Sequence, residues 1–465
     1  MLISGIFNSR NDFLKSFAAF LFLAVTLYFF SIGNYYNSDE GTILNGAWRM
    51  YWGDELYTDF FSYIAPGSYW WTWLSFLVFG PSYFSARFFS IIILTASVLA
   101  VFRITMLAGG RTFSALSAAS AWLLMNVLNV VLINHNNHSS YFASIAILFA
   151  VAAMVFGRKT YFVLAGLFVG ITAVFLQTKG IALAAGLGVP VIYYSFFGNK
   201  EKSKALWFVL GCLTLPAAIF FIWDPAFLYE TLISWPREHY LEVNNISKVL
   251  WFATVAVALV VSYLAFRIRN QLNSGAIFVL VSTEFFMLLA ALTRPDFSHI
   301  MLASFGLIVL SALVLEKYLE VPSDTFGVDQ EIFKKIAVFA LCFSAFFRAV
   351  LLGHSALASE SFFNELLGRY RSEKIYAHPF APGYYFDLGS PSPYYYDLLL
   401  TGMYPDEAFA KNLLQLKQEN PDYVFVNYDA VSKFNYSRAN ALDLFISENY
   451  EPENSAGPLK ILKKK

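Results

Sequence analysis

Long runs of apolar residues, separated by short polar segments, dominate the 465-residue chain. A run of roughly 20 apolar residues is long enough to cross the hydrocarbon core of a bilayer as a helix. By hydropathy, the chain contains about eleven such runs. They lie at about 17–32, 85–107, 113–133, 139–157, 160–176, 180–197, 204–223, 248–266, 275–292, 299–315 and 335–353. The pattern predicts a polytopic α-helical membrane protein.

The segment 33–84, which follows the first apolar run, departs from this pattern. It carries five acidic residues, and it includes Trp70–Phe79, an apolar stretch that is short for a span. Pro66-Gly67 precede this stretch and Gly80-Pro81 follow it, as expected for a separate short helix. We expect 33–84 to be an external loop of helices that lie at the membrane surface or re-enter it.

The segment 354–465 is polar and predicts a separate small α/β domain. Pro405-Asp406-Glu407 is typical of a helix start, and the helical pattern continues to about Glu419. Tyr423–Asn427 is typical of a buried strand, and Leu459–Leu462 is a candidate for another. We therefore expect a transmembrane domain over 1–353 and a C-terminal domain over 354–465.

Basic residues in alternate loops predict the orientation of the chain in the membrane. These loops contain Arg111, Arg158, Lys159, Lys200, Lys202, Lys204, Arg267, Arg269, Lys334 and Lys335. Lys and Arg concentrate in cytoplasmic loops, and Arg10 and Lys15 put the N-terminus on the same side. The external loop 33–84 and the C-terminal domain are then extracytoplasmic. We expect an integral protein of the plasma membrane, or of the inner membrane if the source is bacterial.

Composition supports the membrane class and narrows the set of partners. The chain is 58% hydrophobic and 14% charged, and its mean hydropathy is +0.54. Its 32 basic and 32 acidic residues cancel, so no nucleic acid partner is indicated. Cys212 and Cys342 both lie in apolar runs, which is typical of packing residues.

Acidic residues gather in the external loop, directly after the first span. They are Asp39, Glu40, Asp54, Glu55 and Asp59, against one base, Arg49. Ser38 is a good helix N-cap, so Asp39 and Glu40 are expected in the first helical turn, where the helix dipole favours negative charge. That electrostatic benefit is one sufficient explanation for the two acids. A catalytic role at the membrane edge is the other.

The remaining external loops carry further polar candidates on the same side as Asp39. They include Gln177, Lys179, Arg294, Asp296, His299, His135 and His138. Ionisable groups at membrane depth often face a cavity and mark function. Each also has a simpler interpretation: Lys179 could extend to the interface, Arg294 and Asp296 could pair to hold their loop, and the histidines could belong to a polar helix end.

The external loop also carries a family resemblance. The residues concerned are Ser38-Asp39-Glu40-Gly41, Ala47, Gly53, Tyr57, Asp59-Phe60, Pro66-Gly67 and Gly80-Pro81-Ser82 to Arg87. This pattern resembles the first external loop of GT-C glycosyltransferases, especially the branch of protein O-mannosyltransferases and the lipid A aminoarabinose transferase. Arg294-Pro295-Asp296 with His299, and the α/β tail, extend the likeness. Such enzymes use polyprenyl-phosphate sugars and place an acid of the first loop at the active site.

The resemblance implies a GT-C-like fold and an inverting transfer of a hexose or pentose from a polyprenyl-phosphate donor. The acceptor would be a hydroxyl of a glycan, a lipid or a protein. Asp39 would be the general base, with Glu40 and Asp59 orienting the acceptor or tuning Asp39. Lys179, Arg294 and His299 would stabilise the leaving phosphate, and Gln177 and Asp296 would contribute to substrate binding.

A divalent cation, Mg²⁺ or Mn²⁺, is also compatible with this chemistry. The candidate ligands are Asp39, Glu40, His135 and His138.

Three other functions remain open at this stage. A transporter or lipid flippase is expected to show inverted repeats and charges at mid-bilayer, whereas these ionisable groups gather at one edge. An O-antigen ligase or polymerase also uses polyprenyl carriers, but it resembles a pattern with a large mid-chain external loop. A sugar- or lipid-binding membrane scaffold is the third alternative.

Overall fold

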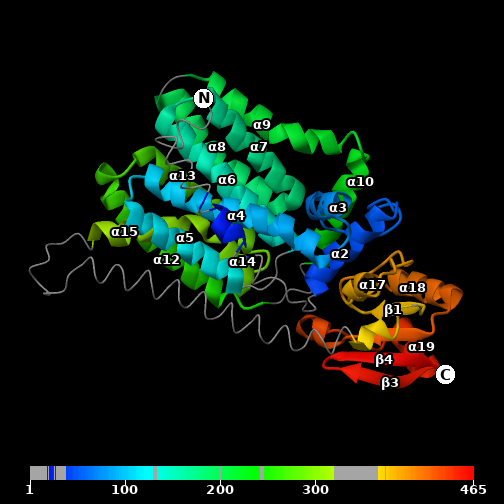
Figure 1. Ribbon diagram of the computed structural model, residues 1–465. Coiled ribbons are helices and arrows are strands. Elements are labelled where there is room, and N and C mark those ends of the chain that lie inside the picture. Colours follow the sequence, from blue (N-terminus) through cyan, green and yellow to red (C-terminus); the bar gives the residue numbers. More distant parts are fainter. Residues whose placement is uncertain are drawn as a thin grey trace, which may run out of the picture.

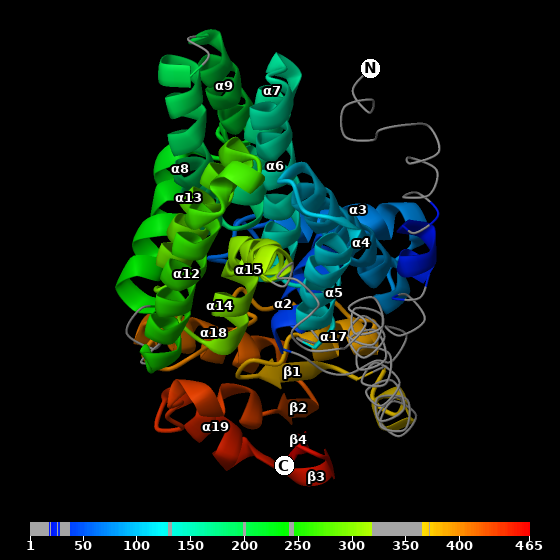
Figure 2. The same ribbon diagram turned by 90° about the vertical axis from the view of Figure 1, so that its left-hand side faces the viewer.

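The computed structural model describes residues 18, 20–25, 27, 38–128, 133–198, 201–240, 246–318, 365–371 and 373–465. These residues form a large bundle of helices and a smaller part that contains a sheet (Figure 1). In a second view the long helices of the bundle run side by side, and the sheet lies beyond one end of them (Figure 2). The predicted spans at 17–32 and 335–353 lie largely or wholly outside the described residues.

The loop that follows the first predicted span folds into two helices, α2 (Ser38–Tyr51) and α3 (Gly67–Phe79). Asp39 and Glu40 occupy the first turn of α2, as predicted. The sequence predicted Ser38 as the N-cap, which is the residue just before a helix. In the structure Ser38 is already part of the helix. Helix α3 begins directly after Pro66 and covers the short apolar stretch, which confirms that this stretch is helical.

The helices of the bundle follow the apolar runs closely. They are α4 (Tyr83–Leu107), α5 (Thr112–Leu128), α6 (His135–Phe156), α7 (Lys159–Phe175), α8 (Gln177–Tyr193), α9 (Ser203–Ile219), α12 (Val249–Arg267), α13 (Ser274–Ala291), α14 (Phe297–Ala303) and α15 (Phe305–Tyr318). Within the described residues, five helices are long and apolar enough to cross a membrane, and the bent pair α14–α15 would make a sixth. The predicted total of about eleven spans stays a prediction.

One predicted span, 299–315, is broken in the structure. Helices α14 and α15 meet at an angle of 62°, with Ser304 between them. The buried Glu284 of α13 accepts a hydrogen bond from the backbone N–H of Leu307 at 2.9 Å, in the first turn of α15. A carboxylate at a helix N-terminus satisfies donors that the break leaves open. The break is therefore stabilised by a neighbouring helix.

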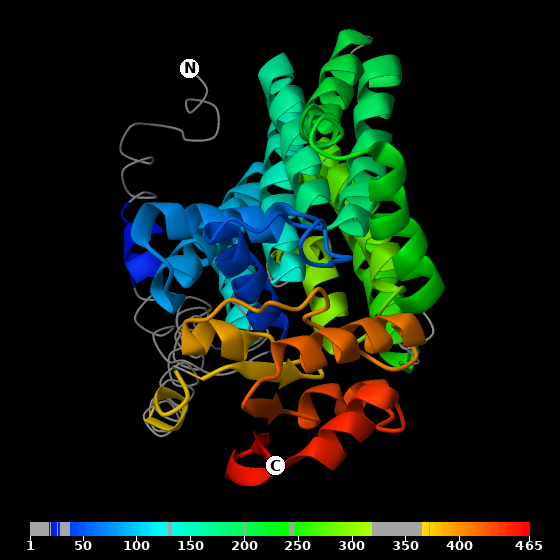
Figure 3. The same ribbon diagram turned by 90° about the vertical axis from the view of Figure 1, so that its right-hand side faces the viewer.

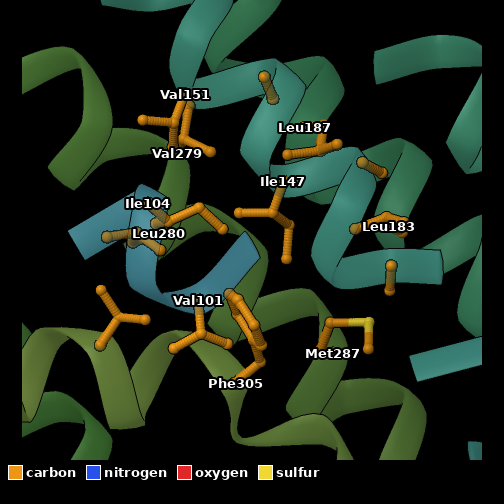
Figure 4. Close-up of a cluster of buried hydrophobic side chains, with 14 of the residues drawn as sticks. Val101, Ile104, Ile147, Val151, Leu183, Leu187, Val279, Leu280, Met287 and Phe305 are labelled. Atoms are coloured by element: carbon orange, nitrogen blue, oxygen red, sulfur yellow. The ribbon is translucent and has the colours of Figure 1, made fainter. Parts of the chain in front are cut away.

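The core of the bundle is a continuous apolar cluster that joins most of its helices. Side chains of α4, α6, α8, α13 and α15 point toward one another in its centre, including Ile104, Ile147, Leu183, Leu280 and Phe305 (Figure 4). All five are buried. Together they pack the five helices into one core.

Helices α7 and α9 approach so closely that only glycine fits between them. A Cβ atom on Gly166 would lie 2.1 Å from the carbonyl oxygen of Phe208, and one on Gly211 would lie 2.5 Å from that of Val163. Small residues permit such backbone contact between membrane helices.

The C-terminal part has its own sheet and its own apolar core. The sheet order is β1-β2-β4-β3, from β1 (Ile375–His378), β2 (Tyr423–Val426), β3 (Tyr450–Ala456) and β4 (Leu459–Lys464). Strand β1 pairs parallel to β2, and the other pairs are antiparallel. The helices are α17 (Gly383–Leu388), α18 (Asp406–Glu419), η6 (Asp429–Phe434) and α19 (Ala441–Asn449). The predicted helix and both predicted strands are present, while β1 and β3 were not predicted.

The loop 33–84 and the C-terminal part pack directly on each other. Helix α17 packs against α2, and a Cβ atom on Gly41 would lie 2.8 Å from Gly383. In a third view α17 and α18 lie between the sheet and the helices of the external loop (Figure 3). The rings of Phe61 and Trp235 join the C-terminal core from the membrane part, with their centroids 5.1 Å apart.

Candidate active site

A cavity of about 580 Å³ lies where three parts of the chain meet. Its walls come from the start of α2, from the ends of α6, α8 and α14, and from the segment 232–240 between α9 and α12. The C-terminal part supplies Phe380, Leu398 and Lys433. Of the predicted site residues, the cavity brings together Asp39, Gln177, Arg294, Asp296 and His299, along with His135.

Asp39 reaches the cavity because it occupies the first turn of α2. One turn later Thr42 also lines the cavity, while the buried Ile43 and Ala47 anchor the helix in an apolar cluster. Asp39 is half-buried and lies close enough to Arg294 for their charges to interact. A carboxylate held in this way is fixed in position but accessible to a substrate.

Tyr63 is a neutral hydrogen-bond donor beside Asp39. Burial raises the pKa of its hydroxyl well above the usual value, with further increases from Tyr240 and from the negative charge of Asp39. Arg294 opposes this shift without cancelling it. Even an unshifted tyrosine keeps its proton at neutral pH, so the O–H of Tyr63 can donate to an oxygen in the cavity.

Arg294, Asp296 and His299 form one hydrogen-bonded unit at the start of α14. Asp296 accepts from Arg294 Nε at 2.9 Å and from the backbone N–H of His299 at 2.9 Å, and its Oδ1 lies 2.7 Å from His299 Nδ1. Burial pushes the pKa of Asp296 upward, but the hydrogen bonds from His299 and the charge of Arg294 outweigh it and hold the pKa below its usual range. Arg294 also donates to the hydroxyl of Tyr240. The unit fixes a guanidinium at the wall of the cavity.

Lys179 lies directly behind that wall. It is 5% exposed, and its ammonium group donates to the carbonyl of Asn136 at 2.8 Å and to Ser140 Oγ at 2.6 Å. Asn136 lines the cavity and also contacts His299 Nε2, at 3.1 Å from its side-chain nitrogen. Lys179 does not line the cavity itself but is hydrogen-bonded to Asn136, which does. Its charge is close enough to interact with His135 and His299.

Gln177 lines the cavity, and its side chain also holds the part of the wall formed by the segment 232–240. Its Nε2 donates to the carbonyl of Leu232 at 2.7 Å. This bond ties the start of α8 to the segment that carries Arg237 and Tyr240.

Glu40 and Asp59, predicted near the reaction centre, do not line the cavity. Glu40 is 1% exposed and pairs with Arg87 of α4 at 3.1 Å, and it accepts from the backbone N–H of Ile133 at 3.3 Å. Asp59 is exposed and accepts from the backbone N–H of Glu55 at 2.7 Å. Glu40 fastens α2 to the bundle, and Asp59 closes a local turn.

Of the four candidate metal ligands, Asp39 and His135 line the cavity, whereas Glu40 and His138 do not. His138 faces Ser68 Oγ at 3.0 Å with Nδ1 and Ser90 Oγ at 2.8 Å with Nε2. Glu40 is engaged by Arg87. Throughout the described part of the chain, no three His, Cys, Asp or Glu side chains are grouped to hold a metal ion. The four candidate ligands are therefore not gathered at one place in this part of the chain, and the divalent cation stays a prediction.

The lining residues that were not predicted include Tyr63, Tyr240, Arg237 and Lys433. Tyr63 and Tyr240 were indistinguishable from the many interfacial aromatics of this chain. Lys433 belongs to the C-terminal part, and its position follows only from the docking of that part on the external loop. The Pro-rich and Tyr-rich composition of 379–396 was the one available signal for a surface that packs on aromatic residues.

The fold and the site together define a class: a helical membrane protein in which the loop 33–84 places an acid in a cavity shared with a C-terminal α/β part. This is the architecture expected of a GT-C glycosyltransferase fold. Comparisons with known proteins confirm that resemblance.

Residues 64–223 match the model of the family described as dolichyl-phosphate-mannose-protein mannosyltransferase. The fold is similar to that of the ArnT protein from Cupriavidus metallidurans bound to undecaprenyl phosphate, with a TM-score of 0.62 and 11% identity over 98% of each chain. The apo state of the same protein gives a TM-score of 0.61 and 12% identity, over 96% of this chain and 97% of that one. No curated protein matches the sequence.

Proposed function

We propose that this protein is a membrane glycosyltransferase that moves a sugar from a polyprenyl-phosphate donor to a hydroxyl group of an acceptor. One observation carries the proposal: Asp39 and Arg294 line the same cavity, with Lys179 directly behind it. A base and a phosphate-binding cation are the two groups that such a transfer needs close together. The matching family and the undecaprenyl phosphate bound to the similar ArnT structure support the same chemistry.

In the proposed reaction the acceptor hydroxyl oxygen attacks the anomeric carbon of the sugar. Asp39 takes the hydroxyl proton while the new C–O bond forms. The bond between the anomeric carbon and the phosphate oxygen breaks, and the electron pair leaves with the lipid phosphate. A single displacement of this kind inverts the configuration at the anomeric carbon.

Arg294 stabilises the leaving phosphate, because a guanidinium binds phosphate through two parallel hydrogen bonds. Asp296 and Tyr240 hold its orientation in the absence of substrate. Lys179 adds positive charge behind Asn136, which itself lines the cavity. His299 and Gln177 complete the donor wall.

We place the cavity on the extracytoplasmic side, because the basic loops of the bundle lie at the opposite ends of the helices. The donor lipid then approaches from the bilayer between helices of the bundle, and the acceptor approaches from the aqueous side through the C-terminal part. In a bacterium the donor would be an undecaprenyl-phosphate sugar.

The test is to incubate the purified protein with a panel of polyprenyl-phosphate sugars and a membrane lipid extract, and to follow polyprenyl phosphate. We expect one donor to release polyprenyl phosphate as its sugar appears on an acceptor. A transporter or flippase would move the lipid-linked sugar across a vesicle bilayer and leave it intact. Movement without bond cleavage would overturn the proposal.

A further inference from the structure

We propose that Glu284 of α13 is a positioning residue for the sugar transfer. Glu284 holds the break between α14 and α15, and through the break it places the wall unit of Arg294, Asp296 and His299 at the cavity. This inference rests on the proposed function, and it adds to that function a residue that does not itself line the cavity.

The first observation is the contact that Glu284 makes between helices. Glu284 is 2% exposed, and its Oε2 accepts from the backbone N–H of Leu307 at 2.9 Å. The backbone N–H of Gly306 is a second donor to the same carboxylate. Both donors belong to the first turn of α15, where N–H groups have no partner within the helix. In the hydrocarbon region of a bilayer no bulk water replaces such a partner, so the start of α15 depends on Glu284.

The second observation is the segment that this contact closes. The hydrogen bond joins α13 to α15, and the chain between its two partners contains the wall unit and the whole of α14. Ser298 and Leu302 of α14 also line the cavity. Because the bond between Glu284 and Leu307 fixes both ends of this segment, it limits the positions that the wall unit can take.

The third observation is that α13 sets the direction of the break. Helices α14 and α15 meet at 62°, and a Cβ atom on Gly306 would lie 2.9 Å from the carbonyl oxygen of Leu280. Leu280 lies one turn before Glu284, and its side chain points into the core together with that of Phe305 (Figure 4). The start of α15 is therefore in close contact with the backbone of α13, and Glu284 adds a directional bond to that contact.

The fourth observation is that core packing alone does not explain a glutamate at this position. Its second oxygen, Oε1, is buried and has no hydrogen-bond partner among the described residues. A buried carboxylate with an open oxygen disfavours the folded state relative to an apolar side chain of similar volume. Ionisable groups inside membrane helices are rare and mark functional positions. The break, and the wall unit that depends on it, account for the glutamate.

The experiment measures the binding of undecaprenyl phosphate, the lipid bound to the similar ArnT structure, to two leucine variants of the purified protein. Glu284→Leu removes the acceptor at the break. Glu316→Leu is the matched control, because Glu316 is buried near the other end of α15 and its Oε2 accepts from the backbone N–H of Arg111 at 2.9 Å. Both changes remove a buried carboxylate that holds a backbone N–H, but only the first acts on the break.

We expect Glu284→Leu to bind the lipid about 10-fold more weakly than Glu316→Leu, which is the size of one hydrogen bond to a charged group. A purely structural role would weaken binding in both variants alike. Equal affinity in the two variants would therefore overturn the proposal.

Glu284→Gln tests whether the hydrogen bond is the cause. The amide keeps one acceptor oxygen but loses the charge, so affinity should fall only about 5-fold relative to wild type, less than in Glu284→Leu. An affinity as low as that of Glu284→Leu would contradict the positioning role.

A second measurement needs no lipid and still applies if Glu284→Leu does not fold. Ser298→Cys, in a chain that also carries Cys212→Ala and Cys342→Ala, places a single thiol on α14 at the cavity. Its rate of reaction with a water-soluble maleimide reports the position of α14. We expect Glu284→Gln to change this rate about 5-fold and Glu316→Gln to leave it unchanged. A rate that Glu284→Gln does not alter would overturn the proposal.

Failure of this inference and failure of the proposed function are distinguishable. If no donor releases polyprenyl phosphate, the glycosyltransferase assignment fails, and the labelling rates still decide whether Glu284 places α14 at the cavity. If sugar transfer occurs but lipid affinity and labelling rate are the same in the Glu284 and Glu316 variants, only the positioning role of Glu284 fails.

Discussion

Helix α2 has acids near both of its ends, but the acids at the two ends make different kinds of contact. At its start, Asp39 lines the cavity, beside the charge of Arg294. After its end, Asp54 and Asp59 serve local structure: Asp54 accepts from Arg49 Nε at 2.7 Å, and Asp59 caps a turn. A cluster of acids in a sequence can therefore combine one acid that lines a cavity with several that serve local structure.

The end of α2 is clamped to the C-terminal part. Arg49 is 3% exposed and donates to Asp397 Oδ2 at 3.1 Å and to the carbonyl of Tyr394. Asn45, one turn earlier, donates to the same oxygen of Asp397 at 2.8 Å. Burial lowers the pKa of Arg49, but the charges of Asp397 and Asp54 outweigh it and the pKa is raised. Because α2 is rigid between its ends, the clamp also fixes the position of Asp39.

The largest expected effect comes from removing the proton acceptor at the start of α2. Asp39→Asn keeps the shape of the side chain but cannot take a proton at neutral pH. A positioned general base contributes ~10²–10⁴-fold, so transfer per folded protein should fall by that order. The thermal unfolding temperature should change little. Normal transfer by this variant would remove Asp39 from the reaction.

The next effect concerns stability and the other end of the helix. Arg49→Met removes one partner of a buried ion pair and leaves Asp397 uncompensated, which typically costs about 3–5 kcal/mol. We expect a clear fall in the free energy of unfolding, measured by denaturant titration in detergent. Lys460→Met, at an exposed site of β4, is the control and should be nearly neutral. A stability equal to that of wild type would show that the clamp does not hold the two parts together.

Donor binding should depend on the cations of the bundle. Arg294→Leu and Lys179→Met each remove a charged hydrogen-bond donor, and such bonds contribute about 1.5–3 kcal/mol. Affinity for the polyprenyl-phosphate sugar should therefore fall about 10- to 100-fold at similar expression, as measured by donor titration. Unchanged affinity in both variants would remove their role in phosphate binding.

A pH effect tests the packing of α17 beside α2. Burial raises the pKa of Asp387 to about 7, with Tyr83 donating to it at 2.7 Å. Its pKa is higher in the folded than in the unfolded chain, so the folded state retains a proton that the unfolded state loses above about pH 4. This group makes stability fall as pH rises from about 4 to 7. In Asp387→Asn, unfolding temperatures over that range should depend less on pH, and an unchanged slope would refute the assignment.

The smallest effect is expected from Asp59→Asn. The exposed side chain lies outside the cavity and closes a local turn, so transfer should stay near normal and stability should change only slightly. A turnover assay and a thermal melt check both points. Loss of transfer here would return Asp59 to the reaction centre, where the sequence pattern had placed it.

Sequence alone predicted the elements better than their contacts. Hydropathy located the helices of the bundle to within a few residues, because apolar runs of membrane length have few alternatives. Asp39, Gln177, Arg294, Asp296 and His299 were selected from polar loops of one side, and the structure places all five on one cavity. What hydropathy did not predict depends on neighbours in space.

The break between α14 and α15 is one such case. It rests on Glu284, which belongs to another helix. Strand β3 is another, since its sequence, Tyr450–Ala456, is mostly polar and exposed and pairs only because β4 lies beside it. A third case is Glu40, which does not line the cavity beside Asp39. Glu40 instead pairs with Arg87, a residue distant in sequence. No local pattern reports contacts of this kind.

The most direct test of Asp39 as the general base measures polyprenyl phosphate release, per folded protein, for Asp39→Asn and Asp59→Asn side by side. The two variants make the same chemical change at two acids of one loop. We expect Asp59→Asn to release ~10²–10⁴ times more polyprenyl phosphate than Asp39→Asn, because only Asp39 is proposed as the base. Equal release from the two variants, or a reversed order, would contradict it.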